Sequence, residues 1–223
     1  TVTTVESLAD NTYSAVVQQV QADGTTSTVN KAALSDLRTT GTSAASGSIV
    51  LRVTTGNLTL QDGTAPANDS AVAADVGSSG NILLETLGAD TTLTAESNAG
   101  ISSGTGNLTL KANGTVDLQD GVAVATAGSG TITLLASTGD LTMDPTATAD
   151  TVDGNQILDA GNGVDDQLVV GDLTATAANI SLTTTGSVLD ADDASSGDDT
   201  DITAQNLRIV AGKGIGLLSD NSL

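Results

Sequence analysis

The sequence of 223 residues contains no cysteine, histidine, phenylalanine or tryptophan, and it has a single tyrosine, Tyr13. Without histidine and cysteine the chain has no imidazole base, no thiolate nucleophile, no disulfide and no zinc site with nitrogen or sulfur ligands. The enzyme classes that depend on those side chains are therefore excluded.

Basic residues are also scarce, with 6 Lys and Arg against 27 Asp and Glu, which gives a formal net charge of −21. Affinity for phosphate needs clustered Lys and Arg, so this charge opposes nucleic acids and anionic membranes. No apolar run approaches the roughly 18 residues that a membrane-spanning helix needs. We expect neither a nucleic-acid partner nor insertion into a membrane.

The first ten residues lack the basic and apolar regions of a signal peptide, so we expect a mature or excised piece of a longer parent chain. The absence of cysteine is typical of large bacterial surface proteins, which cross membranes unfolded. Together these features predict an extracellular or cell-surface location.

One short phrase recurs along the chain: a turn residue, then an apolar, a polar and an apolar residue. It occurs, for example, at Gly56 to Leu60, Gly106 to Leu110 and Gly130 to Leu134. Each copy predicts a strand with period-2 alternation that is entered through Gly, Asn or Asp.

The spacing of the phrase predicts the architecture. Its first strands begin near Ile49, Ile82, Leu108, Ile132, Ile157, Ile180 and Leu207, in steps of 33, 26, 24, 25, 23 and 27 residues. A second strand follows each start, and a weaker third strand fits around Val72, Ile101, Val122, Val152, Leu173 and Ile202. This pattern predicts an all-β fold, a three-sided parallel β-helix of about seven coils.

The composition agrees with this fold, because a narrow interior accepts Leu, Ile, Val and Ala but not aromatic rings. We expect the outward positions to include Thr59, Thr109, Asp117, Thr133, Thr142, Ser181 and Arg208. We expect the inward positions to include Leu58, Leu60, Ile82, Leu84, Leu108, Leu110, Val116, Leu118, Ile132, Leu134, Leu141, Met143, Ile180, Leu182, Leu207, Ile209, Ile215 and Leu217. A bacterial Ig-like or cadherin-like β-sandwich is the rival fold, but it does not predict the return of one phrase at a nearly constant interval.

The repeat divides the chain into two parts. Residues 1–45 do not carry it and are interpreted as an N-terminal cap or an atypical first coil, whereas residues 46–223 form the repeat segment. Residues 62–79 and 144–166 are longer interruptions, which we expect to form loops on one side of the solenoid. Asn81, Asn107, Asn179 and Asn206 hold equivalent places, and their amides are expected to form a ladder between coils.

A group of aspartates near the C-terminus is the candidate metal site. It consists of Asp190, Asp192, Asp193, Asp198, Asp199 and Asp201. Carboxylates at this spacing on a loop can supply oxygen ligands for Ca²⁺, although the order of an EF-hand loop is missing. The alternative is a solvated acidic turn. A fainter calcium candidate is the segment Gly161 to Leu168, which resembles one nonapeptide β-roll repeat.

Enzymatic activity is the main functional alternative, since paired aspartates can act as acid and base in polysaccharide cleavage. The scarcity of aromatic and basic side chains argues against a sugar-cleaving site, and no catalytic residue is predicted.

The phrases from Gly106 to Ala112 and from Gly130 to Ala136 resemble repeats of filamentous-haemagglutinin-type exoproteins and other giant bacterial surface adhesins. The resemblance covers roughly residues 46–223 and implies a right-handed coil, export to the cell surface, and a stiff stalk or adhesive fibre. We therefore expect a non-enzymatic segment that requires no cofactor, with a protein or glycan on another cell surface as partner. A passive spacer or surface-layer element and a pectin-lyase-like enzyme are the alternatives.

Overall fold

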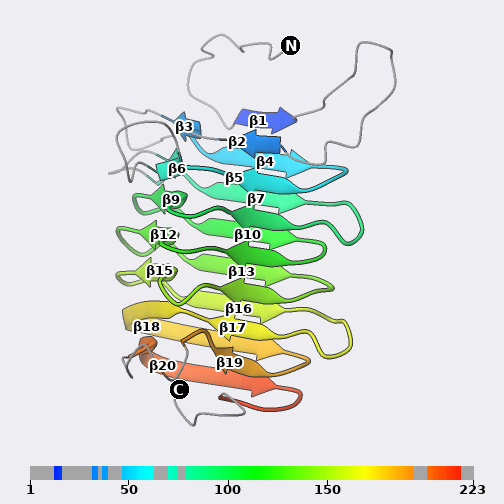
Figure 1. The fold of residues 1–223 in the computed structure, drawn as a ribbon. Coiled ribbons are helices and arrows are strands. Elements are labelled where there is room, and N and C mark those ends of the chain that lie inside the picture. The colour runs from blue at the N-terminus through cyan, green and yellow to red at the C-terminus, as the bar shows by residue number, and fades with distance from the viewer. Residues whose placement is uncertain are drawn as a thin grey trace.

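The computed structural model describes residues 13–16, 32–34, 37–39, 47–62, 70–74, 79–192 and 200–216. Within these ranges the chain forms strands β1 to β20 and no helix. The strands stack in parallel as a β-solenoid of about five turns, which Figure 1 shows from the side. The predicted all-β parallel β-helix is confirmed, whereas the count of seven coils and the N-terminal cap stay predictions. Because the described part has no helix, it has none that could cross a membrane.

Each turn of the solenoid places strands on three sides, and equivalent strands of successive turns pair in parallel. The first stack contains β1 (Tyr13–Val16), β4 (Ile49–Val53), β7 (Ile82–Thr86), β10 (Leu108–Ala112), β13 (Ile132–Ala136) and β16 (Gln156–Ala160). The second contains β2 (Ala32–Leu34), β5 (Leu58–Leu60), β8 (Leu93–Ala95), β11 (Val116–Leu118), β14 (Leu141–Met143), β17 (Leu168–Val170) and β19 (Val188–Asp190). The third contains β3 (Leu37–Thr39), β6 (Ser70–Ala74), β9 (Gly100–Ser103), β12 (Ala123–Thr126) and β15 (Thr148–Thr151).

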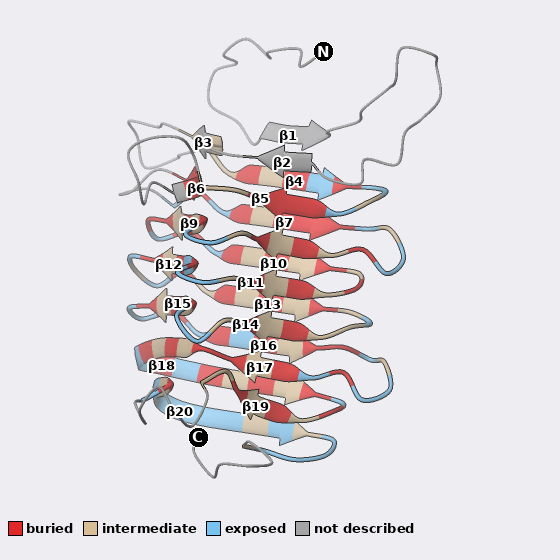
Figure 2. Cartoon of the chain, viewed as in Figure 1, coloured by how far each residue is buried: buried red, intermediate tan, exposed pale blue. Residues whose placement is uncertain are grey.

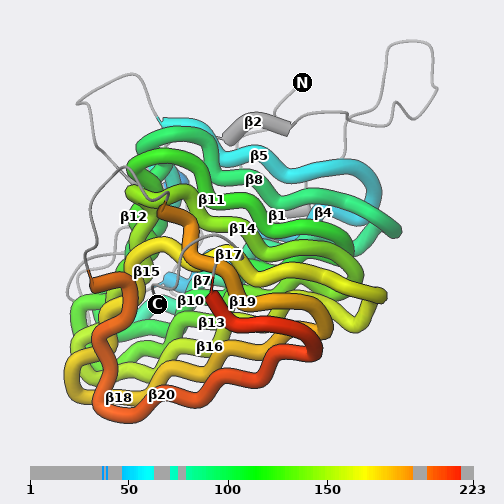
Figure 3. The backbone as a smooth tube through the Cα atoms, turned by 60° about the horizontal axis from the view of Figure 1, so that its bottom comes forward, coloured from blue at the N-terminus to red at the C-terminus, as the bar shows by residue number. Residues whose placement is uncertain are grey.

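Two long strands, β18 (Asp172–Thr184) and β20 (Ile202–Ala211), run through the third stack and continue into the first. Figure 3 shows them curving around one corner of the solenoid, where the earlier turns break into separate strands. Opposite β20, the register of β18 shifts between Ala175 and Asn179. The sharp corner of the earlier turns is thus replaced by a continuous bend in the last two.

The core is a column of aliphatic side chains that runs along the solenoid. Figure 2 shows that buried residues recur in the strands of successive turns. Strands such as β10 and β13 alternate between buried and half-buried residues, as a sheet with one wet face requires. The inward residues predicted between Leu58 and Leu182 are all buried. Since one coil cannot bury its own inward side chains, this column is what holds successive turns together.

One predicted strand start is wrong by a residue. Gln156, and not Ile157, pairs in register between Ile132 and Ile180, while Ile157 faces outward and is 45% exposed. The fully buried Gln156 amide nitrogen donates to the carbonyl oxygens of Ala149 and Thr174, both at 2.7 Å. An isoleucine at this place would leave those two carbonyl groups without that donor. With Gln156 as the inward residue, the steps from Leu108 through Ile132 and Gln156 to Ile180 become equal.

Several other positions also depart from the prediction. In the third stack the strands expected around Val122 and Val152 are present but displaced by one residue, since β12 begins at Ala123 and β15 ends at Thr151. Val122 is buried just before β12, and Val152 is exposed just after β15. Thr59 alternates with the inward Leu58 and Leu60, as an outward residue does, but it is only 6% exposed.

The last turn departs from the prediction as well. Leu207 and Ile215 occupy the predicted columns but are exposed, because no described rung covers them, and Ile209 is only partly buried against the core. Leu217 lies outside the described residues.

The corner that leads into the first stack is built from glycine and asparagine. A side-chain carbon on Gly106, Gly130 or Gly154 would overlap the carbonyl oxygen of the glycine one turn earlier, so the close stacking of turns requires glycine here. Beside this column the Asn81 side-chain oxygen accepts from the Asn107 backbone at 2.8 Å, and the Asn206 amide donates to Asn179 at 2.8 Å. The predicted asparagine ladder is confirmed at these contacts.

Asn155 joins the asparagine ladder through hydrogen bonds from the Asn179 backbone and side chain. Sequence reasoning missed it because the neighbouring inward residue was misassigned.

The two predicted interruptions turn out to contain regular strands. Residues 62–79 include β6, and residues 144–166 include both β15 and the whole of β16. Between these strands the second segment has short turns at residues 144–147 and 152–155 and a longer one from Gly161 to Gln167, where Asp165 has a positive φ of 70°. The long side loops expected of these segments are therefore absent from their described parts.

Candidate functional site

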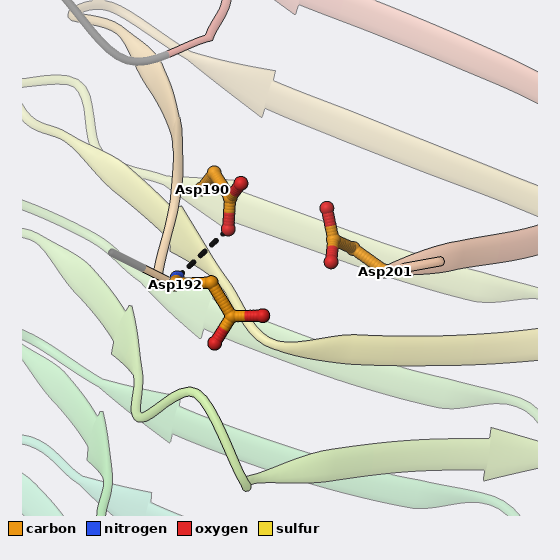
Figure 4. A group of neighbouring side chains, drawn as sticks. All are labelled: Asp190, Asp192 and Asp201. Carbon is orange, nitrogen blue, oxygen red and sulfur yellow. Dashed lines mark hydrogen bonds between the residues drawn. The ribbon is translucent and has the colours of Figure 1, made fainter. Parts of the chain in front are cut away.

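Three of the predicted aspartates come together where the chain leaves the second stack. Asp190 ends β19, Asp192 follows it, and Asp201 directly precedes β20. One carboxylate oxygen of each lies within 4.8 Å of the others (Figure 4). Asp193, Asp198 and Asp199 lie outside the described residues.

The backbone of the preceding turn positions this cluster. The Ala191 amide donates to the Val170 carbonyl at 2.9 Å, and the Leu173 amide donates to the Asp201 carbonyl at 2.6 Å. The Asp192 amide donates to the Asp190 carboxylate at 2.8 Å, which fixes one carboxylate within the turn (Figure 4). Asp190 and Asp201 are both more than nine-tenths buried.

Three carboxylates so close together repel one another when ionised, and a divalent cation would offset this repulsion. Carboxylate oxygens are the ligands that Ca²⁺ prefers, in sets of six to eight oxygens. The three side chains would supply only part of such a set, with backbone carbonyls and water supplying the rest. The arrangement fits the donor chemistry of calcium without the order of an EF-hand.

The second calcium candidate, the segment Gly161 to Leu168, does not form a carboxylate cluster in the structure. The Asp166 carboxylate turns back into its own loop and accepts from the Gly163 amide at 2.7 Å. Asp165 forms an ion pair with the ammonium group of Lys213 at 2.8 Å. Both carboxylates are thus engaged by the protein itself, which is the geometry of a closed turn.

A groove of about 470 Å³ lies on the outer side of β11 and β14, and sequence reasoning did not find it. Its walls include Asp117, Gln119, Asp120, Thr142 and Asp144, and no Lys, Arg or aromatic side chain is among its lining residues. The Asp117 carboxylate accepts from the Thr142 hydroxyl at 2.9 Å and from the Gln119 amide at 3.3 Å. Asp117 was predicted to face outward, but a single strand pattern does not reveal a hollow formed by several turns.

The groove adjoins the aspartate cluster through Ala191, which lies between Asp190 and Asp192 and also lines the groove. Carboxylate and amide groups on such a wall can accept hydrogen bonds from hydroxyl-rich ligands. The usual stacking platform for sugar rings, an aromatic side chain, is missing from the lining.

An ion cluster around the buried Glu85, on the outer side of the first stack, is the other polar feature that sequence reasoning missed. Glu85 is 4% exposed, and its carboxylate contacts the guanidinium of Arg52 and the ammonium of Lys111, each at 2.8 Å. The three residues are cross-strand partners in β4, β7 and β10. The aligned charges could have been found from the strand register. The cluster links three turns, and each of the two Glu85 carboxylate oxygens contacts a basic side chain. We therefore interpret the cluster as structural.

Asp159 lies further along the same outward row, beyond Leu135. Burial raises the pKa of its carboxyl above the ordinary value, because desolvation penalises the charged form. No basic partner of Asp159 is present in the described part of the chain.

The comparisons with known proteins add no relative. The chain matches no protein-family model, no curated protein and no solved structure.

Proposed function

We propose that the chain is a non-enzymatic structural segment, a stiff β-helical stalk or fibre of a large bacterial surface protein that takes part in cell adhesion or cell contact. Its partner is a protein or glycan on another cell surface, and the segment belongs to a longer parent chain outside the cell.

The main support for this proposal is that successive turns keep the same strand register. The register from Ile82 through Leu108, Ile132 and Gln156 to Ile180 is kept across five successive turns. Parallel hydrogen bonding and a continuous aliphatic core connect every turn to the next, so bending the solenoid requires several turns to open together. A constant cross-section of this kind supports a spacer or fibre, whose task is to hold two ends apart.

The composition supports an extracellular setting for the stalk. Stability comes from stacked aliphatic side chains and from asparagine and ion-pair contacts between turns, and none of it depends on cysteine chemistry. A chain without disulfides needs no oxidation step after it crosses a membrane unfolded.

The Asp190, Asp192 and Asp201 cluster gives the stalk a place for Ca²⁺. An ion bound there would connect the end of β19 to the start of β20 and so stabilise the last described turn. Calcium is a proposed stabiliser of the fold and has no proposed part in a reaction.

Adhesion is tested with beads that carry the whole chain, exposed to cells or to immobilised glycans under flow. Beads that carry the destabilised variant Leu110→Asp, unfolded in urea before coupling and held in a urea concentration above its midpoint, serve as the control, because this variant stays acidic but loses the stacked surface. We expect the folded chain to retain beads and the unfolded one not to. Equal retention by the two would contradict an adhesive role and leave the passive spacer.

The groove on β11 and β14 supports one second candidate, a polysaccharide-active enzyme. There Asp117, Asp120 and Asp144 provide carboxylates that could serve as acid and base. Release of reducing ends or unsaturated products from a panel of acidic and neutral polysaccharides is the readout. Turnover that disappears in Asp144→Asn but persists in Asp153→Asn, an exposed control outside the groove, would replace the structural proposal with the enzymatic one.

A further inference from the structure

The groove on β11 and β14 lies in the middle of the solenoid, where both of these strands have a neighbour on each side. Strand β11 pairs with β8 and β14, and β14 also pairs with β17. Between Ser97, after β8, and Val169, in β17, four successive turns contribute to the lining, which at about 4.8 Å per turn gives a length of roughly 15 Å. Turns added at either end of the chain would leave this part unchanged, because each turn contacts only its neighbours.

The hydrogen-bond donors of the groove wall are largely used within the wall. The Thr142 hydroxyl and the Gln119 amide, which line the groove, both donate to the Asp117 carboxylate. Next to them the Thr146 hydroxyl donates to the Asp120 carboxylate. A carboxylate has lone pairs for more than one donor, so both carboxylates can still accept hydrogen bonds from a ligand.

Asp144 adds a carboxylate to the same wall. Its backbone is fixed, because its amide donates to the Leu118 carbonyl at 2.8 Å. Within the part of the chain that the structure describes, no side chain or backbone group donates to the Asp144 carboxylate. The groove therefore offers acceptors and negative charge, and a ligand has to supply donors. An ammonium group supplies three donors together with the opposite charge.

The register of the strands favours a ligand that repeats at the spacing of the turns. The outward residues Asp117, Thr142 and Val169 are aligned in β11, β14 and β17, and Gln119 and Asp144 directly follow the first two of these strands. A pyranose unit in an extended chain is similar in length to this spacing, so successive sugars meet equivalent positions. An extended peptide rises only about 3.3 Å per residue and falls out of step with the turns.

We propose that the groove on β11 and β14 binds a linear chain of amino sugars that carry free ammonium groups, with the chain lying along the solenoid. The inference rests on the adhesive role proposed above and specifies its glycan partner. Ammonium groups contact the Asp144 and Asp117 carboxylates, and sugar hydroxyls donate to the remaining acceptors. Since no aromatic side chain lines the groove, charge and hydrogen bonds dominate the contact, and added salt weakens it.

The ligand chemistry is tested by isothermal titration calorimetry of the whole chain with three oligosaccharides. One is an oligomer of glucosamine with free amines, the second is the same oligomer N-acetylated, and the third is an oligomer of a uronic acid. EDTA is present throughout, so that no divalent cation can connect the protein to the sugar. We expect the free amine form to bind, the acetylated form to bind at least about ten-fold more weakly, and the uronic acid form not to bind.

A pair of charge-matched variants separates the groove from the general acidity of the chain. Asp144→Asn and Asp153→Asn each remove one negative charge, but Asp153 is exposed and does not line the groove. We expect Asp144→Asn to raise the dissociation constant of the glucosamine oligomer by about three-fold or more, and Asp153→Asn to leave it nearly unchanged. Urea titrations followed by circular dichroism establish that both variants fold.

The absence of tryptophan allows a probe to be placed in the groove itself. Val169→Trp introduces a single indole at a half-buried position of the lining, and Ile157→Trp introduces one on the outward side of the first stack. We expect the glucosamine oligomer to change the emission of Val169→Trp at the concentrations that calorimetry gives, and to leave that of Ile157→Trp constant. An equal change in both variants would place the sugar outside the groove.

Three further results would overturn the proposal. One is equal affinity for the free amine and acetylated oligomers, because the ammonium group would then not be recognised. Another is an equal loss of affinity in Asp144→Asn and Asp153→Asn, which would indicate attraction by net charge alone. The third is an oligolysine peptide that binds more tightly than the sugar and loses affinity only in Asp144→Asn, which would assign the groove to a basic protein.

The bead experiment distinguishes failure of this inference from failure of the adhesive role. If beads that carry Asp144→Asn are retained by cells as well as those that carry the parent chain, and the glucosamine oligomer does not bind, the groove is not the adhesive surface but adhesion stands. If the oligomer binds as expected and the parent beads are not retained, the groove assignment stands and the adhesive role fails.

Discussion

The middle of the solenoid and its last described turn carry the same residue pattern but differ in burial. Leu108 and Leu207 occupy the same column of the first stack, yet Leu108 is fully buried and Leu207 is 47% exposed. The strands also hydrogen-bond alike to the turn before them. Burial in this fold is therefore a property of the stack and not of the single strand, and it requires a neighbour on both sides.

The largest expected effect comes from placing a charge in the middle of the column. Leu110→Asp should lower the free energy of unfolding by about 4 kcal/mol or more, since it adds an unpaired buried carboxylate and removes packing. Thr109→Asp, one residue away on the outward side, should cost less than about 0.5 kcal/mol. Urea denaturation followed by circular dichroism measures both, and equal midpoints would contradict the assigned register.

Truncation of equivalent leucines tests the comparison directly. Leu108→Ala should destabilise by about 3 kcal/mol because it leaves a cavity between two turns, while Leu207→Ala should cost about 1 kcal/mol because half of that side chain is already in water. The two variants differ only in the position of the turn within the stack. If they lose equal stability in urea, the last turn is covered as fully as the middle.

Calcium binding offers a third test of this comparison, because the aspartate cluster lies where the last described turn begins. At a concentration about ten times its dissociation constant, Ca²⁺ should stabilise the chain by about 1.4 kcal/mol over an EDTA-treated sample. Differential scanning calorimetry should show a higher Tm with calcium, and Asp201→Asn should abolish the shift. Asp153→Asn, outside the cluster, should keep it. An unchanged Tm for the parent chain would leave the cluster as an acidic turn.

The smallest expected effect concerns Asp159 in the middle of the solenoid. Its folded pKa is raised above the ordinary value of 3.8, so the unfolded chain gives up this proton first as the pH rises. Asp159 therefore lowers stability once the pH exceeds the pKa of the unfolded chain. Well below that pKa, the folded and unfolded states both hold the proton. Asp159→Asn should be slightly more stable than the parent chain at pH 7 and equal to it near pH 3. Urea midpoints at the two pH values measure this, and a gain that is equal at both would point to packing instead of ionisation.

Much of this architecture could be predicted because the period-2 strands and the nearly constant interval between their restarts are visible along the chain itself. The exact register could not, since Gln156 in the core is stabilised by carbonyl groups of Ala149 and Thr174 that only the folded turn brings near. The strands expected around Val122 and Val152 lie one residue away from those positions for a similar reason. Small residues such as Ala149 fill the third side, and an apolar pattern does not distinguish them from the loop residues around them.

The candidate site could be predicted only in part. The aspartates from 190 to 201 are conspicuous in the sequence, and three of them do meet in space. The groove and the Glu85 ion cluster are made by side chains from different turns, so they become visible only when the turns are aligned. Exposure of Leu207 likewise depends on what lies beyond its strand and not on its own neighbours in the sequence.

The glycine column at the corner restricts how such a chain can change its length. Gly106, Gly130 and Gly154 each lie against the carbonyl group of the previous turn, and they recur at equal intervals along the sequence. If one residue were lost or gained between two of these glycines and no loop compensated, a residue with a side chain would take the place of a glycine. Its side-chain carbon would then overlap the carbonyl oxygen of the previous turn. Duplication or deletion of one entire repeat keeps every clearance intact. Genetic variation in length is therefore expected to occur by whole repeats, which would lengthen or shorten the solenoid without altering its width.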